Sequence, residues 1–112
     1  MKDINWNTKK NKQLINSILA LRDSNEARKF IRDLMTKKEV KEFANRLEAA
    51  SLLSQGIRYT TIVEGTGLSS TTIARIQKWL KGSLGGYRLV LSRLVSQHHT
   101  SSSLGKGLSL SS

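Results

Sequence analysis

The stretch YTTIVEGTGLSSTTIARIQKWL, residues 59–80, predicts two short helices joined by a tight turn. Gly67 stands where the chain must reverse, and glycine adopts the positive φ that such a turn commonly needs without steric cost. Ser69 is a candidate N-cap for the second helix, because its hydroxyl can accept hydrogen bonds from the free N–H groups of the next turn. Apolar residues at helical spacing give that helix one face to bury. They are Ile73, Ile76 and Leu80. The stretch is therefore predicted to be a helix-turn-helix.

The opposite face of the second helix is small or hydroxylated at its start and basic further along. Its residues are Ser70, Thr71, Ala74, Arg75 and Lys78. Such a surface suits a helix in the major groove of DNA, where arginine bonds guanine and hydroxyls bond base edges or phosphate. Thr60 and Thr61, at the start of the first helix, are candidate phosphate contacts through hydroxyl and backbone N–H. The predicted DNA-binding set is Thr60, Thr61, Ser69, Ser70, Thr71, Thr72, Arg75 and Lys78. An ordinary helical hairpin within a core is the alternative interpretation.

Charge points to the same class of partner. The chain has 112 residues and a formal net charge of +11. Residues 49–112 carry 7 basic residues and a single acidic one, Glu64, so the half with the helix-turn-helix is nearly free of anions. A basic surface attracts polyanions by releasing condensed counterions, which makes nucleic acid the leading partner class. An acidic membrane surface would respond to the same charge.

Composition narrows the remaining classes. No apolar run approaches the roughly 18 residues that span a bilayer, and the N-terminus lacks the apolar segment of a signal peptide. Cysteine is absent, which excludes disulfides and thiolate zinc sites and fits a reducing cytoplasm. No catalytic residues are predicted, because no Ser/His/Asp set or phosphate-binding glycine loop is present. No metal site is predicted either, since His98 and His99 have no acidic or cysteine partner nearby.

The rest of the chain shows apolar residues at helical spacing, with no alternating strand pattern and no internal repeat, so the fold class is all-α. We expect helices over about 8–22, 24–35, 36–55 and 87–97, the second of them capped by Ser24. Residues 1–97 are predicted to form one helical DNA-binding and dimerisation domain. The tail, residues 98–112, is rich in Ser and Gly and is predicted to be disordered.

The third of these helices carries the clearest local signals. Thr36 and Glu39 have the spacing of a capping box at its start. Gly56 would end it as a left-handed residue. We expect an inward face formed by Val40, Phe43, Leu47, Ala50, Leu52 and Leu53.

Wide apolar stripes on several helices also predict self-association. A single chain of this length would leave much of these stripes exposed, and a second copy would bury them. Two-fold dimers suit DNA operators, whose half-sites lie about one helical turn (~34 Å) apart. We therefore expect a homodimer.

The segment from Phe30 to Tyr87 resembles the Trp repressor superfamily and is most similar to its YerC/YecD-type branch of Trp repressor-related proteins. The Leu-Met-Thr-x-x-Glu entry to the third helix, an Arg-Leu pair and a Thr-Ile-x-Arg segment recur in register, and Gly85-Gly86-Tyr87 fits that branch. The resemblance implies a six-helix, all-α chain that forms an intertwined homodimer. It also implies two helix-turn-helix units that project to successive major grooves.

The Trp repressor holds L-tryptophan between two arginines, and the matching positions here are Arg46 and Arg75. Its pocket threonines match Thr36 and Thr72. Two further positions differ, because Ile76 stands where the repressor has glycine and Trp79 where it has serine. These six residues form the candidate ligand pocket that the resemblance implies.

Large side chains in place of small ones would fill the space of an indole ring. We therefore hypothesise that the protein binds DNA without L-tryptophan or another small co-repressor. In an alternative interpretation, Arg46 simply pairs with Glu42 or Glu39 on its own helix, while Arg75 touches phosphate or a base edge.

The sequence thus predicts a cytoplasmic transcriptional regulator, a repressor, that binds specific double-stranded DNA as a helix-turn-helix homodimer and is not an enzyme. Two alternatives stay open. One is a protein-interaction adaptor whose basic face docks on an acidic protein. The other is the helix-turn-helix DNA-binding subunit of a transposase.

Overall fold

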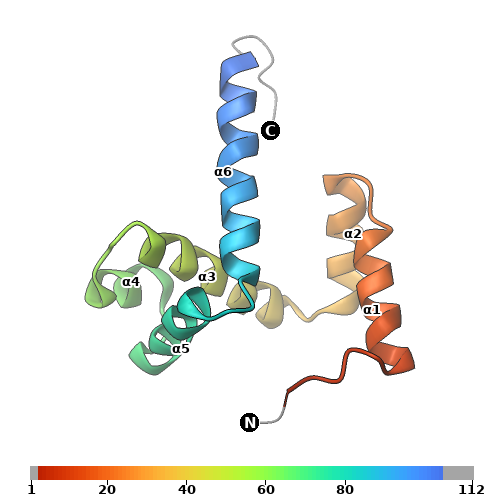
Figure 1. The fold of residues 1–112 in the computed structure, drawn as a ribbon, viewed down its shortest axis with the longest axis horizontal. Coiled ribbons are helices and arrows are strands. Elements are labelled where there is room, and N and C mark those ends of the chain that lie inside the picture. The colour runs from red at the N-terminus through yellow and green to blue at the C-terminus, as the bar shows by residue number, and fades with distance from the viewer. Residues whose placement is uncertain (1–2, 105–112) are drawn as a thin grey trace. The chain divides into compact units, whose positions relative to one another are not determined.

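The computed structural model of the protein describes residues 3–104, with side chains through Ser96. Within this range the chain forms six helices and no strand (Figure 1). They are α1 (Lys9–Leu19), α2 (Ser24–Leu34), α3 (Lys37–Ser54), α4 (Tyr59–Thr66), α5 (Ser70–Lys81) and α6 (Gly86–Leu104). The all-α prediction is confirmed. The chain divides into two compact units, residues 1–40 and 41–112, and the single domain predicted over residues 1–97 stays a prediction.

One hydrophobic cluster organises the second unit and joins α3, α4 and α5. Its buried members are Ala49, Ala50, Ile62, Ile73, Ile76 and Leu80. Half-buried apolar side chains pack against it, among them Tyr87 and Leu91 of α6. The buried face predicted for α5 is therefore confirmed.

The turn between α4 and α5 follows from three local features. Gly67 has φ 74° and ends α4 in the left-handed conformation, with its N–H donating to the Val63 carbonyl at 2.8 Å. Ser69 caps α5, and its hydroxyl oxygen accepts from the Thr72 N–H at 3.1 Å. Both assignments confirm the sequence prediction. The third feature is Thr66, whose buried hydroxyl donates to the Ile62 carbonyl at 2.7 Å and accepts from the Leu68 N–H at 3.2 Å.

Both ends of α3 also match the local signals. The Thr36 N–H donates to Glu39 Oε1 at 2.9 Å, and the Glu39 N–H donates to Thr36 Oγ1 at 3.0 Å. This reciprocal pair is the predicted capping box. Gly56, just past the helix end, has φ 80°.

The start of α2 differs from the prediction that Ser24 caps it. Asp23 is the N-cap, and its carboxylate accepts from the Glu26 N–H at 2.9 Å, while Ser24 is the first helical residue. Asp23 has the same three-residue spacing to a glutamate that marks the α3 box, and Glu26 Oε1 accepts in return from the Arg22 N–H at 2.9 Å. α1 ends at Leu19 instead of continuing to about residue 22, and the Arg22 N–H, which a longer helix would bond to Ile18, donates to Glu26 instead.

The end of α6 also differs from the prediction. The helix continues past Gln97, where its end was expected, to Leu104. The reason is that no glycine or proline occurs between Tyr87 and Leu104, so nothing in the sequence breaks the helix before Gly105. The remainder of the predicted disordered tail, residues 105–112, lies outside the described residues.

The inward face predicted for α3 is only partly present in one chain. Val40, Phe43 and Leu47 are exposed, whereas Ala49 and Ala50 are fully buried. These two alanines are buried because the hydrophobic cluster with α4 and α5 forms at the carboxyl half of α3. The amino half of its apolar stripe has no such partner within the described chain.

Apolar stripes on three other helices are exposed as well. No side chain among residues 3–40 is buried. The exposed large apolar residues are Leu14, Ile15, Ile18 and Leu19 on α1, Ile31 and Leu34 on α2, and Leu89, Val90, Leu94 and Val95 on α6. A lone chain therefore leaves these stripes in contact with water, as the sequence indicated. None of the described helices is both long and apolar enough to pass through a membrane.

The turn glycine gives the first testable prediction. Gly67→Ala places a Cβ in the left-handed region, which costs about 1–2 kcal/mol for a residue with a side chain. No atom lies within 4 Å of that Cβ, so backbone conformation is the whole cause. We expect the free energy of unfolding, measured by urea denaturation at fixed protein concentration, to fall by this amount.

Gly65→Ala is the matched control, because Gly65 lies in α4, also has open space at its Cβ and has no positive φ. Alanine should stabilise the helix there by up to about 1 kcal/mol. Equal effects at the two positions would contradict the role assigned to the turn.

Candidate nucleic-acid interface

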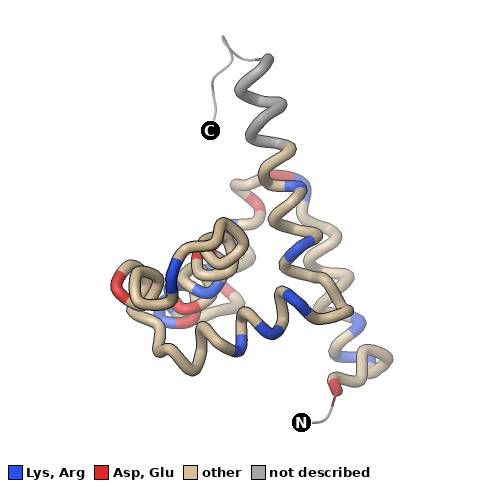
Figure 2. The backbone as a smooth tube through the Cα atoms, turned by 60° about the vertical axis from the view of Figure 1, so that its left-hand side comes forward, with Lys and Arg blue, Asp and Glu red and all other residues tan. Residues whose placement is uncertain are grey.

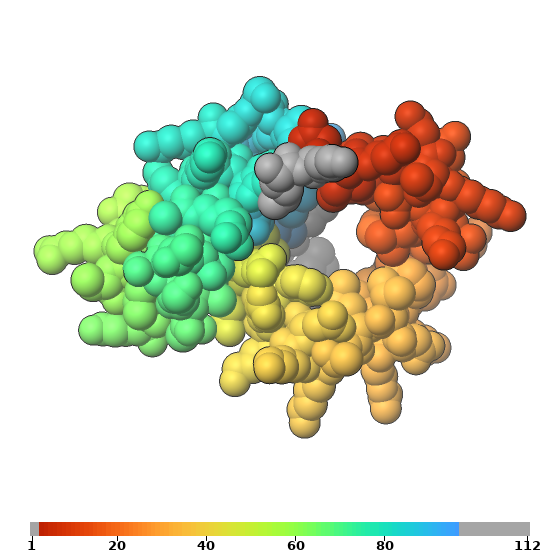
Figure 3. Space-filling model, turned by 90° about the horizontal axis from the view of Figure 1, so that it is seen from below, coloured from red at the N-terminus to blue at the C-terminus, as the bar shows by residue number. Residues whose placement is uncertain are grey.

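The outward face of α5 carries the candidate DNA contacts. Ser70, Thr71, Arg75 and Lys78 are exposed, while the opposite face of the same helix is buried in the hydrophobic cluster. Burial of one face fixes which side chains point outward, so the arrangement follows from the helical period alone. The surface residues of α4 and α5 adjoin in the space-filling view (Figure 3).

Two of the predicted contacts already have a partner within the protein. The Ser69 hydroxyl donates to Thr72 Oγ1 at 3.1 Å, and Ser69 Oγ accepts from the Thr72 N–H. Thr72 is half-buried. These two residues shape the start of α5, and every member of the predicted set except Thr72 is exposed.

The start of α4 presents a second polar surface. Arg58 is the N-cap of α4 and makes no side-chain capping bond. The first N–H groups of a helix have no intrahelical acceptor, and Thr60 and Thr61 are exposed in the same turn. Backbone donors at a helix N-terminus together with hydroxyls form a suitable site for a phosphate oxygen.

Basic residues outnumber acidic ones in the half of the sequence that holds these residues. Figure 2 shows lysine and arginine distributed along the chain, with acidic residues fewer. From Ala49 onward Glu64 is the single acidic residue in the sequence, so α5 and α6 carry none. A polyanion that approaches α5 would therefore meet no acidic side chain of α5 or α6.

The six positions of the candidate ligand pocket have different surroundings. Arg46 pairs with Glu42, with Nη2 and Oε2 2.5 Å apart, and its guanidinium lies over the Phe43 ring at 5.6 Å. The observed contact agrees with the alternative interpretation of Arg46, in which it forms an ion pair on its own helix. Arg75 is exposed on α5, and the Thr36 hydroxyl accepts the capping bond at the start of α3.

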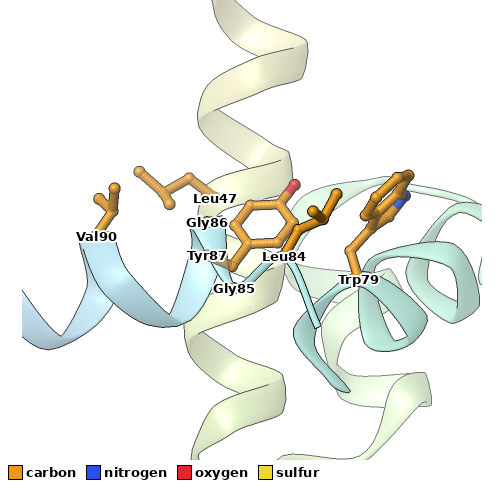
Figure 4. Close-up of a pocket in the computed structure, with 7 residues that line it drawn as sticks. All are labelled: Leu47, Trp79, Leu84, Gly85, Gly86, Tyr87 and Val90. Carbon is orange, nitrogen blue, oxygen red and sulfur yellow. The ribbon is translucent and has the colours of Figure 1, made fainter. Parts of the chain in front are cut away.

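The two large apolar residues of this set, Ile76 and Trp79, differ in exposure. Ile76 is 3% exposed and belongs to the hydrophobic cluster, whereas Trp79 is 48% exposed. Trp79 lines an apolar hollow of about 470 Å³. The other lining residues are Leu47, Leu84, Gly85, Gly86, Tyr87 and Val90 (Figure 4). Within one chain, Ile76 therefore fills space in the core, and the indole of Trp79 stands at the edge of an open hollow.

Sequence reasoning missed Thr66, which ties α4 to the turn through its buried hydroxyl. A threonine in the last turn of a predicted helix, next to a turn glycine, was the available signal. Its side chain can accept from the N–H beyond the turn, as hydroxyl-bearing turn residues commonly do.

Three comparisons place the chain among known proteins. The sequence model of the family described as "Trp repressor protein" matches residues 9–95. The uncharacterized protein YerC of Bacillus subtilis (strain 168) is 40% identical over 91 residues, which cover 81% of this chain and 88% of YerC. A crystal structure of a TrpR-like protein from Eubacterium eligens ATCC 27750 aligns with a TM-score of 0.75 and 36% sequence identity, covering 80% of this chain and 92% of that one.

The surroundings of Arg46, Ile76 and Trp79 lead to a prediction about L-tryptophan. Arg46 already has a carboxylate partner, and Ile76 occupies its space with its own side chain. We expect isothermal titration calorimetry to show no stoichiometric binding of L-tryptophan. Duplex affinity should also be equal with and without it.

L-Phenylalanine, titrated under the same conditions, controls for weak nonspecific binding of an aromatic amino acid. Stoichiometric heat with L-tryptophan together with tighter duplex binding would contradict the prediction.

Proposed function

Since this chain belongs to the Trp repressor family of helix-turn-helix DNA-binding regulators, we propose that it binds specific double-stranded DNA and represses transcription. The proposal places it in the cytoplasm of a bacterium, where the chromosome is accessible. Recognition would need no L-tryptophan.

The observation that carries the proposal is the division of α5 into two faces. Its apolar face is buried in the hydrophobic cluster, and its opposite face presents Ser70, Thr71, Arg75 and Lys78. Arginine can bond guanine through two parallel hydrogen bonds, and serine or threonine can serve a base edge or a phosphate. Lysine contributes a compact charge to phosphate. The face therefore combines groups for base recognition with groups for backbone attraction.

The start of α4 supplies a second contact in this proposal. Thr60 and Thr61 would hold a phosphate oxygen through hydroxyl and backbone N–H groups. Phosphate contacts carry no sequence information, but they fix the register of the protein on the duplex. A fixed register is what allows α5 to meet one set of base edges.

A homodimer is the proposed acting form. No side chain among residues 3–40 is buried, and the apolar stripe of α6 is exposed. Fully burying a large apolar side chain is worth about 1.5–3 kcal/mol. Since these side chains are already partly buried, a second copy would add part of that value at each exposed position of both chains. Two-fold symmetry would then present a pair of α5 helices to two half-sites.

Paired charge removal on α5 tests DNA binding. We expect Arg75→Ala combined with Lys78→Ala to weaken duplex binding, measured by fluorescence anisotropy over a range of salt concentrations. The log–log salt slope should become shallower by about 0.9 for each phosphate that the variant no longer neutralises. With an operator first selected from random duplexes, discrimination between that operator and a scrambled duplex should fall as well if Arg75 contacts a base.

The control removes two positive charges, also three residues apart, from another helix. Lys29→Ala combined with Arg32→Ala takes two exposed cations, three residues apart, from α2. This control pair should change duplex affinity much less than the α5 pair does. Equal reductions of affinity in the two variants would contradict the assignment of α5. Negligible duplex affinity at low salt, with an acidic protein that co-purifies, would favour the adaptor over a DNA-binding regulator.

A charge in the apolar stripe of α6 tests the dimer. Leu94→Glu should shift sedimentation equilibrium toward the monomer, because burying an unpaired carboxylate is costly. Ser96→Glu, on the same helix and also exposed, should leave the equilibrium unchanged. A monomeric parent chain, or a dimer indifferent to Leu94→Glu, would contradict the assembly.

A further inference from the structure

The carboxyl end of α5 is held by an arginine from the next helix. Arg88 lies in the first turn of α6, and its Nη1 donates to the Leu80 carbonyl and, at 2.7 Å, to the Gly82 carbonyl. Leu80 is the last buried apolar residue of α5, and Gly82 is its C-cap. One side chain thus bonds carbonyls on both sides of the helix end.

These carbonyls need a donor from elsewhere because the end of α5 lacks the commonest glycine cap. Gly82 is extended, with φ −73° and ψ 170°, and is not left-handed. The last carbonyls of a helix have no intrahelical donor, and a left-handed residue would normally supply the missing N–H groups. A guanidinium supplies donors in a fixed planar fork, and its positive charge suits the negative end of the helix dipole.

Gly85 leaves the room that this guanidinium occupies. A Cβ built on Gly85 would lie 2.9 Å from Arg88 Nη2, and Gly85 has φ +71°. An alanine there would displace the guanidinium from the carbonyls, because the arginine end is flexible and the backbone is not. Gly85 and Arg88 therefore act as a pair that the loop between α5 and α6 requires.

We propose that Arg88 is a positioning residue for DNA recognition, which fixes the carboxyl end of α5 to the first turn of α6. The inference rests on the proposed function: the hydrophobic cluster sets which face of α5 is exposed, and Arg88 holds the carboxyl end of that helix in place for DNA contact. Lys78, one turn before the capped end, is the proposed DNA contact nearest to Arg88 in the chain. Arg88 itself makes no phosphate contact in this proposal.

The test compares Arg88→Met with Arg93→Met, which removes the same charge from the same helix at an exposed position. We expect Arg88→Met, which removes both hydrogen bonds to the carbonyls, to weaken duplex binding by about tenfold or more. Its salt slope should stay unchanged, since the number of neutralised phosphates stays the same. Arg93→Met should bind duplex with nearly the affinity of the parent chain. Sedimentation should show the same oligomeric state for the parent chain and both variants.

A second measurement does not depend on DNA. Hydrogen exchange at the amides of Leu80, Lys81 and Gly82 should accelerate in Arg88→Met and stay unchanged in Arg93→Met. Arg88→Lys, which restores a donor but not the fork, should recover part of the protection and part of the affinity.

A double-mutant cycle tests the pairing with Gly85. Gly85→Ala carries the cost of its positive φ in either background, but the displacement of the guanidinium exists only when Arg88 is present. The reduction of affinity in Gly85→Ala should therefore be smaller in the Arg88→Met background than in the parent. Additive effects of the two substitutions would overturn the pairing.

Two results would overturn the proposal itself. One is equal affinity and equal exchange in Arg88→Met and Arg93→Met. The other is a shallower salt slope in Arg88→Met alone, which would make Arg88 a phosphate contact. If the parent chain binds no duplex while exchange still depends on Arg88, the proposed function fails and the role of Arg88 at the helix end stands.

Discussion

Presentation of the basic face of α5 depends on the hydrophobic cluster that buries its other face. Ile73 and Ile76 occupy that cluster with Ile62 of α4, and the two alanines of α3 complete it. An amphipathic helix has no reason to face one way unless its apolar stripe has a partner. Because the stripe is buried, the exposed positions of α5 follow from the helical period, and the small and basic side chains are the ones left outside.

Local signals in the sequence were sufficient for much of this fold. Gly67 and Gly56 adopt positive φ, and Ser69 and the Thr36–Glu39 pair make the capping bonds their spacing predicts. Each of these depends on a few neighbouring residues, so no tertiary information is needed. The choice of Asp23 over Ser24 as N-cap was harder, because both residue types cap well and only the backbone path decides between them.

Long-range features were beyond the sequence. Hydrophobic periodicity shows that α3 has an apolar stripe, but it does not show which half will find a partner within the same chain. The exposed face of α5 was predictable for the same reason that its buried face was. The hydrogen bond from Arg88 to Leu80 was not predictable, because it joins residues of different helices across an irregular loop. Nothing in the sequence distinguishes Gly85 from an ordinary glycine of a flexible loop.

The candidate DNA contacts and the exposed apolar stripes lie mainly on different helices. Exposed large apolar residues lie mainly on α1, α2, α6 and the amino half of α3, whereas the outward face of α5 presents Ser70, Thr71, Arg75 and Lys78, and Trp79 is its one large exposed apolar residue. In the proposed homodimer, a second copy would remove the hydrocarbon of these stripes from water and leave the cations of α5 solvated for DNA. Arg88 stands where the two regions meet, at the junction of α5 and α6, and its carbonyl bonds join the helix proposed to bind DNA to a helix proposed to bind a second chain.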